Sequence, residues 1–285
     1  MKITLLLLSA FFYADVSYAS NVAWMGQDLP YIGNKKLAEI AIPGTHDSGT
    51  LNINSASGKN NAKTQSKSLI EQLEAGVRYF DIRFYNNRDS GKDCPIPSDY
   101  YIYHNSDLNW IDQYVSYRLN EAMDQIVSFV KRPENKHEVL ILDIQKIETG
   151  STGSDAVLLS LIQKYLDGHI IKNIPSQNWW KLTFNELINL DTGKKNSAKV
   201  ILLVSNGDFA KDASNNPVEV PKGCGVSMNP ELWHTNRWQI VNGLYNERRT
   251  YSTGLDSDIF SQLGQNYAIS HNMTNAFDKY RKWQE

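Results

Sequence analysis

The sequence has little of three features that would each indicate a particular class of protein. It contains only two cysteines in 285 residues, Cys94 and Cys224, and their different neighbours do not favour a thiolate metal site. Acidic and basic residues nearly balance, with a formal net charge of −2, so bulk electrostatics gives no reason to expect nucleic acid as a partner. Beyond the first residues, no segment is apolar enough to cross a membrane.

The N-terminus carries the one pronounced hydrophobic run. Lys2 precedes this run, and Ser17-Tyr18-Ala19 supplies small residues where a signal peptidase reads the chain. The run is too short to span a bilayer, so residues 1–19 are predicted to be a secretory signal peptide, with a buried first helix as the alternative. We therefore expect a secreted or periplasmic protein whose single domain covers residues 20–285. In such a compartment Cys94 and Cys224 can form a disulfide, but the sequence alone leaves this pairing open.

The rest of the chain alternates between predicted strands and helices, without an internal repeat or a long linker. This alternation and the length favour one α/β domain of the (β/α) TIM-type barrel class. The predicted strands are Leu37–Ile42, Val77–Arg83, Tyr100–His104, Val139–Gln145, Lys199–Ser205, Gly225–Met228 and Tyr267–Ser270. The predicted helices are Ser66–Ala75, Trp110–Val130, Ser154–Leu166, Trp179–Leu190, Asn236–Arg248 and Thr274–Trp283.

The strand count is one short of the eight that a (β/α) barrel needs. The sequence stops at Glu285, inside a predicted amphipathic helix and without a further apolar strand. We expect either an open barrel or, as the favoured reading, a barrel domain that is C-terminally incomplete and lacks its last strand.

Three predicted strands end on groups that can move a proton or hold an anion. The first strand leads into Pro43–Ser48, whose sequence Pro-Gly-Thr-His-Asp-Ser presents His46 and Asp47. The second ends in Asp81-Ile82-Arg83, and the third ends in His104. Active sites of (β/α) barrels are built at the C-terminal ends of the strands. Two histidines and an arginine suit phosphoryl transfer as one base, one acid and one fixed positive charge.

These motifs resemble the catalytic X domain of phosphatidylinositol-specific phospholipase C, in its bacterial, metal-independent branch. The resemblance rests on Pro43–Ser48, Asp81-Ile82-Arg83, His104 and the strand Glu138–Asp143, and it covers roughly residues 37 to 146. It implies a barrel phosphodiesterase that needs neither a metal nor another cofactor.

The candidate catalytic residues each receive a role on this basis. His46 is assigned as the general base and His104 as the general acid. Arg83 binds the phosphate and stands where the metal-dependent branch has a carboxylate, so no metal site is expected. Asp47 is expected to pair with the arginine on the phosphate side, and Asp81 to position His104 or Arg83. The resemblance also implies an aspartate from the last strand that orients the base, and no residue is assigned to it.

The head-group contacts are less well defined by the sequence. The family holds inositol with a basic residue and a carboxylate of the fourth strand and a basic residue of the fifth. Here the polar groups of the fourth strand are shifted in phase, and the fifth ends without an arginine. The candidate contacts are Asp143, Gln145, Trp233, Asn236 and Tyr267, and packing is the alternative for each.

The sequence thus predicts a phosphodiesterase that cleaves a phospholipid to diacylglycerol and a cyclic phosphate. It is expected to act as a monomer that touches membrane surfaces transiently. One alternative is a metal-dependent phosphodiesterase acting on glycerophosphodiesters or sphingolipids, which requires carboxylates in place of Arg83. The other is a non-catalytic barrel that binds head groups, which predicts that losing either histidine leaves function intact.

Overall fold

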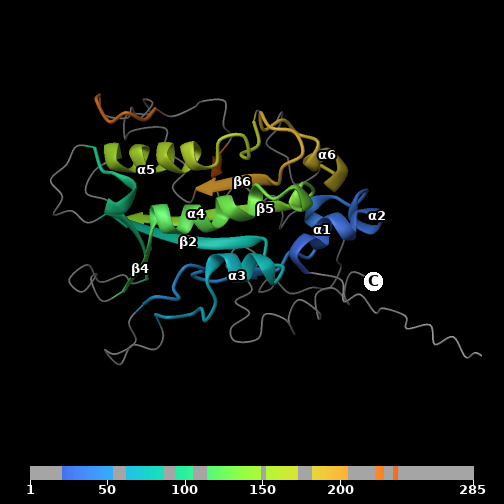
Figure 1. The fold of residues 1–285 in the computed structure, drawn as a ribbon, viewed down its shortest axis with the longest axis horizontal. Coiled ribbons are helices and arrows are strands. Elements are labelled where there is room, and N and C mark those ends of the chain that lie inside the picture. The colour runs from blue at the N-terminus through green and yellow to red at the C-terminus, as the bar shows by residue number, and fades with distance from the viewer. Residues whose placement is uncertain are drawn as a thin grey trace, which may run out of the picture.

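The computed structural model describes residues 21–53, 62–86, 94–104, 114–148, 152–172, 182–204, 222–227 and 234–236. Helices and strands alternate along these residues, and Figure 1 shows their arrangement. The elements are α1 (Trp24–Gln27), α2 (Leu29–Ile32), β1 (Gly44–Thr45), α3 (Leu69–Glu74), β2 (Tyr79–Asn86), β3 (Tyr100–Tyr103), β4 (Val115–Arg118), α4 (Leu119–Val130), β5 (Val139–Glu148), α5 (Thr152–Tyr165), α6 (Phe184–Ile188), β6 (Lys199–Val204) and β7 (His234–Asn236).

The strands form one mixed sheet with the order β4-β3-β2-β5-β6-β7. β2, β5, β6 and β7 are parallel, and β1 pairs in parallel with the start of β2. β3 and β4 are antiparallel additions beside the end of β2. The α/β class predicted from the sequence is confirmed, whereas closure of the sheet into a barrel stays a prediction.

The two faces of the central strands have different surroundings. Side chains that alternate along β2, β5 and β6, such as Phe80, Leu142 and Leu202, form the larger apolar cluster with α3, α4 and α5. Figure 1 shows these three helices running alongside the sheet. On the opposite face the starts of β5 and β6 pack against residues of α1, α2 and α6, including Trp24 and Phe184. Because both faces are covered at this end, polar groups on the second face lie farther along the strands.

Helix α3 begins and ends as the sequence indicates. Ser68 caps its first turn: the Ser68 hydroxyl accepts from the amide of Glu71, and the Glu71 carboxylate accepts from the amide of Ser68. The chain leaves the helix through Gly76, whose φ of 100° favours glycine. The helix predicted over Ser66–Ala75 is therefore confirmed, with Ser68 as its N-terminal cap and Gly76 directly after its last turn.

Several predicted elements differ in the structure. Residues 37–39 form a short 3₁₀ helix, and the strand begins only at Gly44 because its partner, β2, first reaches it there. The predicted helix from Trp110 to Val130 is wrong at its start: residues 115–118 are strand β4, which pairs with β3. β3 also runs antiparallel to β2, so it does not end at the same edge as the parallel strands.

The predictions for the later chain are tested only in part. No strand covers residues 225–227 in the described segment, and β7 lies instead at His234–Asn236, so Asn236 does not begin a helix. The predicted elements at 267–270 and 274–283, the remainder of the 236–248 helix, and the signal peptide lie outside the described residues.

A disulfide joins two segments that are distant in the sequence. Cys94 and Cys224 lie 130 residues apart, and their Cα atoms are separated by 4.9 Å. The bond connects the segment before β3 to the segment after β6, and Cys224 packs against the larger apolar cluster. A crosslink over such a separation stabilises the fold by restricting the unfolded chain. Within the described residues, no helix is long and apolar enough to span a bilayer.

A buried ion pair fastens the N-terminal segment to the sheet. Arg78 Nε donates to Glu138 Oε2 over 2.7 Å, and both side chains are fully buried. The guanidinium also donates to the carbonyl oxygens of Leu73, Val77 and Val22, and the amide of Gly26 donates to Glu138. Burial disfavours both charges, lowering the pKa of Arg78 and raising that of Glu138, so each group depends on its partner.

Replacing Arg78 with Met should lower the free energy of unfolding by about 3–5 kcal/mol, because Glu138 keeps a buried charge without its partner. The control is Arg132→Met, which breaks the ion pair between Arg132 and Glu74. These two side chains are 31% and 43% exposed, so the loss in the free energy of unfolding should be less than about 1 kcal/mol. Urea unfolding of the three proteins measures both values. Equal losses in the two variants would contradict the importance given to burial.

Candidate active site

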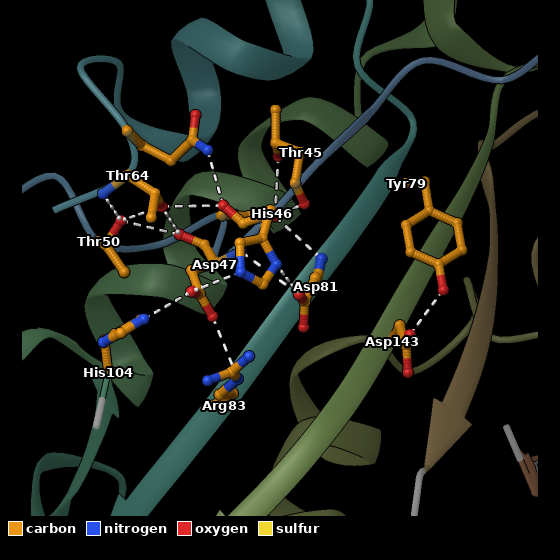
Figure 2. A network of polar contacts seen from close by, with 12 residues as sticks. Thr45, His46, Asp47, Thr50, Thr64, Tyr79, Asp81, Arg83, His104 and Asp143 are labelled. Atoms are coloured by element: carbon orange, nitrogen blue, oxygen red, sulfur yellow. Dashed lines mark hydrogen bonds and ion pairs between the residues drawn. The ribbon is translucent and has the colours of Figure 1, made fainter. Parts of the chain in front are cut away.

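The polar groups of the second sheet face gather around the turn that follows β1. Figure 2 shows His46 and Asp47 from this turn, Asp81 and Arg83 from β2, and His104 from the residue after β3. The structure therefore brings together all five candidate catalytic residues of the sequence. His104 arrives because β3 runs back along β2, with Ile102 in register with Phe84. The antiparallel direction thus places His104 near the middle of β2, where Asp81 and Arg83 lie.

The turn that carries His46 and Asp47 is held by hydrogen bonds to buried groups. The Ser48 amide donates to the Asp81 carbonyl over 2.8 Å, and the Asp81 amide donates to Ser48 Oγ over 2.9 Å. Gln72 Nε2 from α3 donates to the Ser48 carbonyl over 2.7 Å. Gly44 opens the turn, and a Cβ at this position would lie 3.1 Å from Tyr79 Cβ, so a larger residue is disfavoured.

Asp47 has a φ of 47°, in the left-handed region that non-glycine residues seldom adopt. Its carbonyl accepts from Thr50 Oγ1 over 2.9 Å and from Thr64 Oγ1 over 3.3 Å. The carbonyl of His46 accepts from Gln65 Nε2 over 2.7 Å. These contacts fix the backbone in its strained conformation, and so they fix the direction of the Asp47 side chain.

The Asp47 carboxylate lies at the centre of the cluster. Its Oδ2 is 3.0 Å from His46 Nε2 and 3.1 Å from His104 Nε2, and its Oδ1 is 3.1 Å from Arg83 Nε. The Asp47 side chain is fully buried, whereas those of His46, His104 and Arg83 are 33%, 25% and 21% exposed. Three groups that can carry positive charge therefore converge on one buried anion and keep contact with solvent.

The second nitrogen of His46 has its own carboxylate. His46 Nδ1 lies 2.8 Å from Asp81 Oδ2, and Asp81 is fully buried. The expectation that Asp81 positions His104 or Arg83 is therefore wrong in this structure. Asp81 contacts His46 because the turn after β1 places the imidazole beside it. Asp81 thus lies where a carboxylate would fix the orientation of the His46 imidazole.

The charges in the cluster depend on one another. Hydrogen bonds to Asp47 and Asp81 raise the pKa of His46 to about 9, against an opposing effect of burial. Burial alone would raise the pKa of Asp47, but hydrogen bonds from His104 and His46 and the charge of Arg83 hold it well below its usual range. The two carboxylates therefore favour the protonated form of His46 at neutral pH.

Asp143, the one head-group candidate whose side chain the structure describes, is not part of this cluster. Asp143 lies beside Asp81 in the register of β2 and β5, but it is fully buried and its Oδ2 accepts from the Tyr79 hydroxyl over 2.6 Å. Figure 2 shows this pair to one side of the Asp47 contacts. Trp233 and Tyr267 lie outside the described residues, and Asn236 ends β7 with its backbone in register with Val204.

An irregularity in β5 changes the phase of its polar residues. Ile82 pairs with Ile144, but Arg83 pairs with Lys146, so the register passes over Gln145. Beyond this point Glu148 is in register with Tyr85. A bulge of this kind moves the following positions to the opposite face of a strand. The backbone of Lys146 and Glu148, and not that of Gln145, is therefore in register with Arg83 and Tyr85.

Five residues that support the site do not stand out as functional in the sequence. Ser48, Thr50, Thr64, Gln65 and Gln72 hold the turn in place, and only Ser48 belongs to the motif that drew attention to it. Thr64 and Gln65 lie in a loop without periodicity, so no pattern could relate them to the site. Gln72 offered a signal, since it is a polar residue on the buried face of a predicted helix.

One part of the cluster has the composition of a metal site. His46, Asp47 and Asp81 offer ligand atoms that lie within 4.8 Å of one another. The neighbouring charges do not suit a divalent cation, because Arg83 Nε lies 3.1 Å from Asp47 and His46 favours its protonated form. These donors are already engaged in ion pairs that a metal would have to replace.

Comparison with known proteins gives relatives of a consistent kind. The chain is 32% identical to a 1-phosphatidylinositol phosphodiesterase of Listeria monocytogenes over 146 residues, which cover 50% of this chain and 39% of the relative. It is 24% identical over 308 residues to a PI-PLC X domain-containing protein of Dictyostelium discoideum, covering 93% of this chain and 48% of the relative. The chain therefore spans about half or less of the length of these curated relatives.

Solved structures give matches of the same kind at a weaker level. A phosphatidylinositol-specific phospholipase C from Staphylococcus aureus, with pentafluoro-Phe incorporated, matches with a TM-score of 0.49 and 18% identity, covering 84% of this chain and 75% of that chain. The Listeria monocytogenes enzyme matches with a TM-score of 0.46 and 25% identity over 66% of this chain and 57% of that chain. No family model matches the sequence. The resemblance drawn from the sequence motifs is confirmed by the named curated relatives.

The imidazole signals of His46 should titrate near pH 9 by NMR, and Asp81→Asn should move the midpoint down towards 6.5, because one of the two hydrogen-bonded carboxylates is lost. Because the pKa of His46 is higher in the folded than in the unfolded state, its protonation stabilises the fold. This contribution is complete below pH 6.5 and is lost as the pH rises to about 9. Unfolding free energy should therefore fall more steeply over this range in the wild type than in Asp81→Asn. A wild-type midpoint near 6.5 would contradict the contacts described for His46.

Proposed function

From the similarity of this chain to phosphatidylinositol-specific phospholipase C X-domain proteins, we propose that it is a phosphodiesterase acting on a phosphatidylinositol-type lipid. The observation that carries the proposal is the convergence of His46, His104 and Arg83 on one point, each with a nitrogen 3.0–3.1 Å from the Asp47 carboxylate. A group of two imidazoles and a guanidinium around one anion is the arrangement that a phosphate ester requires.

The reaction proceeds by attack of a neighbouring hydroxyl of the head group on phosphorus. His46 takes the hydroxyl proton as the new P–O bond forms, and His104 gives a proton to the alcohol oxygen as the old P–O bond breaks. Arg83 stabilises the charge that develops on the non-bridging oxygens. The products are a cyclic phosphate and a diacylglycerol. Neither proton step requires a metal ion, which is consistent with the ion pairs that engage Asp47.

Asp81 orients the base in this scheme. A carboxylate on Nδ1 selects the tautomer whose Nε2 faces the substrate and stabilises the imidazolium that forms. Asp47 binds the same histidine through Nε2 in the ligand-free site, over 3.0 Å. The neutral form of His46 is then a minor species at neutral pH, so the proposal requires the substrate to weaken the His46–Asp47 contact.

We place the protein outside the cytoplasm, as a monomer that meets lipid at a membrane surface. Two features support this location: the leader-like residues 1–19 and the disulfide between Cys94 and Cys224. Structural disulfides persist in oxidising compartments and are rare in the cytosol. The domain of residues 20–285 is proposed to be a single catalytic unit.

Replacing His46 with Ala should lower turnover of phosphatidylinositol ~10²–10⁴-fold, since general base catalysis contributes about that much. Substrate affinity should change far less than turnover. His137→Ala is the matched control, because His137 lies outside the cluster and should keep turnover near the wild-type value. Radiolabelled or fluorescent substrate gives the rates, and circular dichroism checks the fold. A folded His46→Ala variant with wild-type turnover would remove His46 from the mechanism and would favour the head-group-binding alternative.

Arg83→Lys should lower turnover by at least tenfold although the charge is kept, because an ammonium cannot reproduce the planar, two-donor geometry of the guanidinium. Arg118→Lys is the control: Arg118 donates to the Ser98 carbonyl and stacks on Tyr101, away from the cluster. Steady-state assays of both variants make the comparison. Full activity in Arg83→Lys would show that a point charge suffices and that the proposed two-donor binding of phosphate by Arg83 is wrong.

A further inference from the structure

Asp47 has contacts that a purely structural carboxylate would not need. Both of its carboxylate oxygens face groups that can be positively charged: Oδ1 faces Arg83, and Oδ2 faces His46 and His104. The same three groups are the phosphate ligands and proton carriers of the proposed reaction. One side chain of the protein therefore makes the contacts that a bound phosphate would make.

The position of this carboxylate is built into the fold. Asp47 is 2% exposed, and its left-handed backbone is held by Thr50, Thr64 and the buried turn around Ser48. The turn returns the side chain towards β2, where Arg83 and the His46 imidazole lie. The Asp47 backbone therefore stays beside the cluster as long as these hydrogen bonds are kept, so a phosphate that reaches the three basic groups comes close to this carboxylate.

The charges around this point limit which anions can enter. The groups that can carry positive charge are Arg83 from β2, His46 from the turn after β1 and His104 from the residue after β3. Facing them are Asp47 of the same turn and Asp81 of β2, with Asp143 of β5 beside Asp81 in register. Two carboxylates in direct contact with the cations leave little positive charge for a ligand. A phosphodiester brings one negative charge, whereas a phosphomonoester brings nearly two at neutral pH.

We propose that Asp47 is a specificity-determining residue: its carboxylate lies among the three basic groups that a bound phosphate would contact, and it makes the site favour singly charged phosphodiesters over doubly charged phosphomonoesters. This inference rests on the proposed function and deepens it. The repulsion acts at short range and in a buried environment, where water screens it poorly. A second negative charge on the ligand is therefore rejected, while the first is balanced by Arg83 and the histidines.

The test compares two small ligands that differ by one methyl group, methyl phenyl phosphate as the diester and phenyl phosphate as the monoester. Dissociation constants are measured by calorimetry at pH 6.8, where the monoester is mostly doubly charged and Asp81 still favours protonated His46. The proteins are the full chain, Asp47→Asn and Asp47→Gly, since asparagine and glycine both accept a left-handed backbone. Asp143→Asn is the matched control, because it removes a buried carboxylate of the same face that accepts a hydrogen bond from the Tyr79 hydroxyl.

The wild type should bind the diester more tightly than the monoester. Asp47→Asn and Asp47→Gly should shift this preference at least tenfold towards the monoester, and Asp143→Asn should shift it less than threefold. An unchanged preference for the diester in both Asp47 variants would overturn the proposal. A shift in Asp143→Asn as large as that in the Asp47 variants would also overturn it, because any buried carboxylate of this face would then have the same electrostatic effect. The wild-type assay on phosphatidylinositol is separate, so failure of the proposed function and failure of this selectivity give different results.

Discussion

The site depends on the contact between the Asp47 carboxylate and the three groups around it. Without this anion, Arg83, His46 and His104 would place two or three positive charges side by side in a partly buried space, where repulsion is strong. Asp47 compensates them with distances of 3.0–3.1 Å, and the charges in turn hold its pKa well below its usual range. The backbone of the turn directs this carboxylate towards the three groups. Asp47 has a φ of 47°, and hydrogen bonds from Thr50 and Thr64 to its carbonyl hold this conformation. Asp81 then contacts the second nitrogen of His46, so a buried carboxylate lies against each ring nitrogen of this histidine.

The fold explains why this arrangement can form. The helices α3, α4 and α5 cover one face of β2, β5 and β6, and the N-terminal segment with α6 covers the starts of β5 and β6 on the other. Polar residues on the second face can then lie only farther along the strands, where Asp81, Arg83 and Asp143 occur. The buried Arg78–Glu138 pair fastens the N-terminal segment at the opposite end of the same strands, away from the polar cluster. One end of the sheet is thus packed on both faces, and the other carries the polar cluster.

Much of this was predictable from the sequence where the pattern is local. The predicted strands Val139–Gln145 and Lys199–Ser205 and the predicted helix Ser66–Ala75 correspond to β5, β6 and α3. The residues His46, Asp47, Asp81, Arg83 and His104 were found because each follows or ends an apolar strand. What failed depends on pairing between distant segments. Residues 115–118 have a helical pattern but are drawn into a strand by β3, and Asp81 contacts His46 because β1 and β2 pair in a particular register. The irregularity at Gln145 also has no local signal, since it is defined only by the register with β2.

The most direct test of this account is the product of the reaction in the presence of a chelator. Phosphatidylinositol would be incubated with the full chain and excess EDTA, and phosphorus NMR would follow the phosphate signals with time. We expect full activity, with a cyclic phosphate appearing before any phosphomonoester, because a neighbouring hydroxyl attacks and Arg83 supplies the positive charge. Loss of activity in EDTA that calcium restores, or a phosphomonoester as the first product, would contradict metal-independent acid–base catalysis by the two histidines.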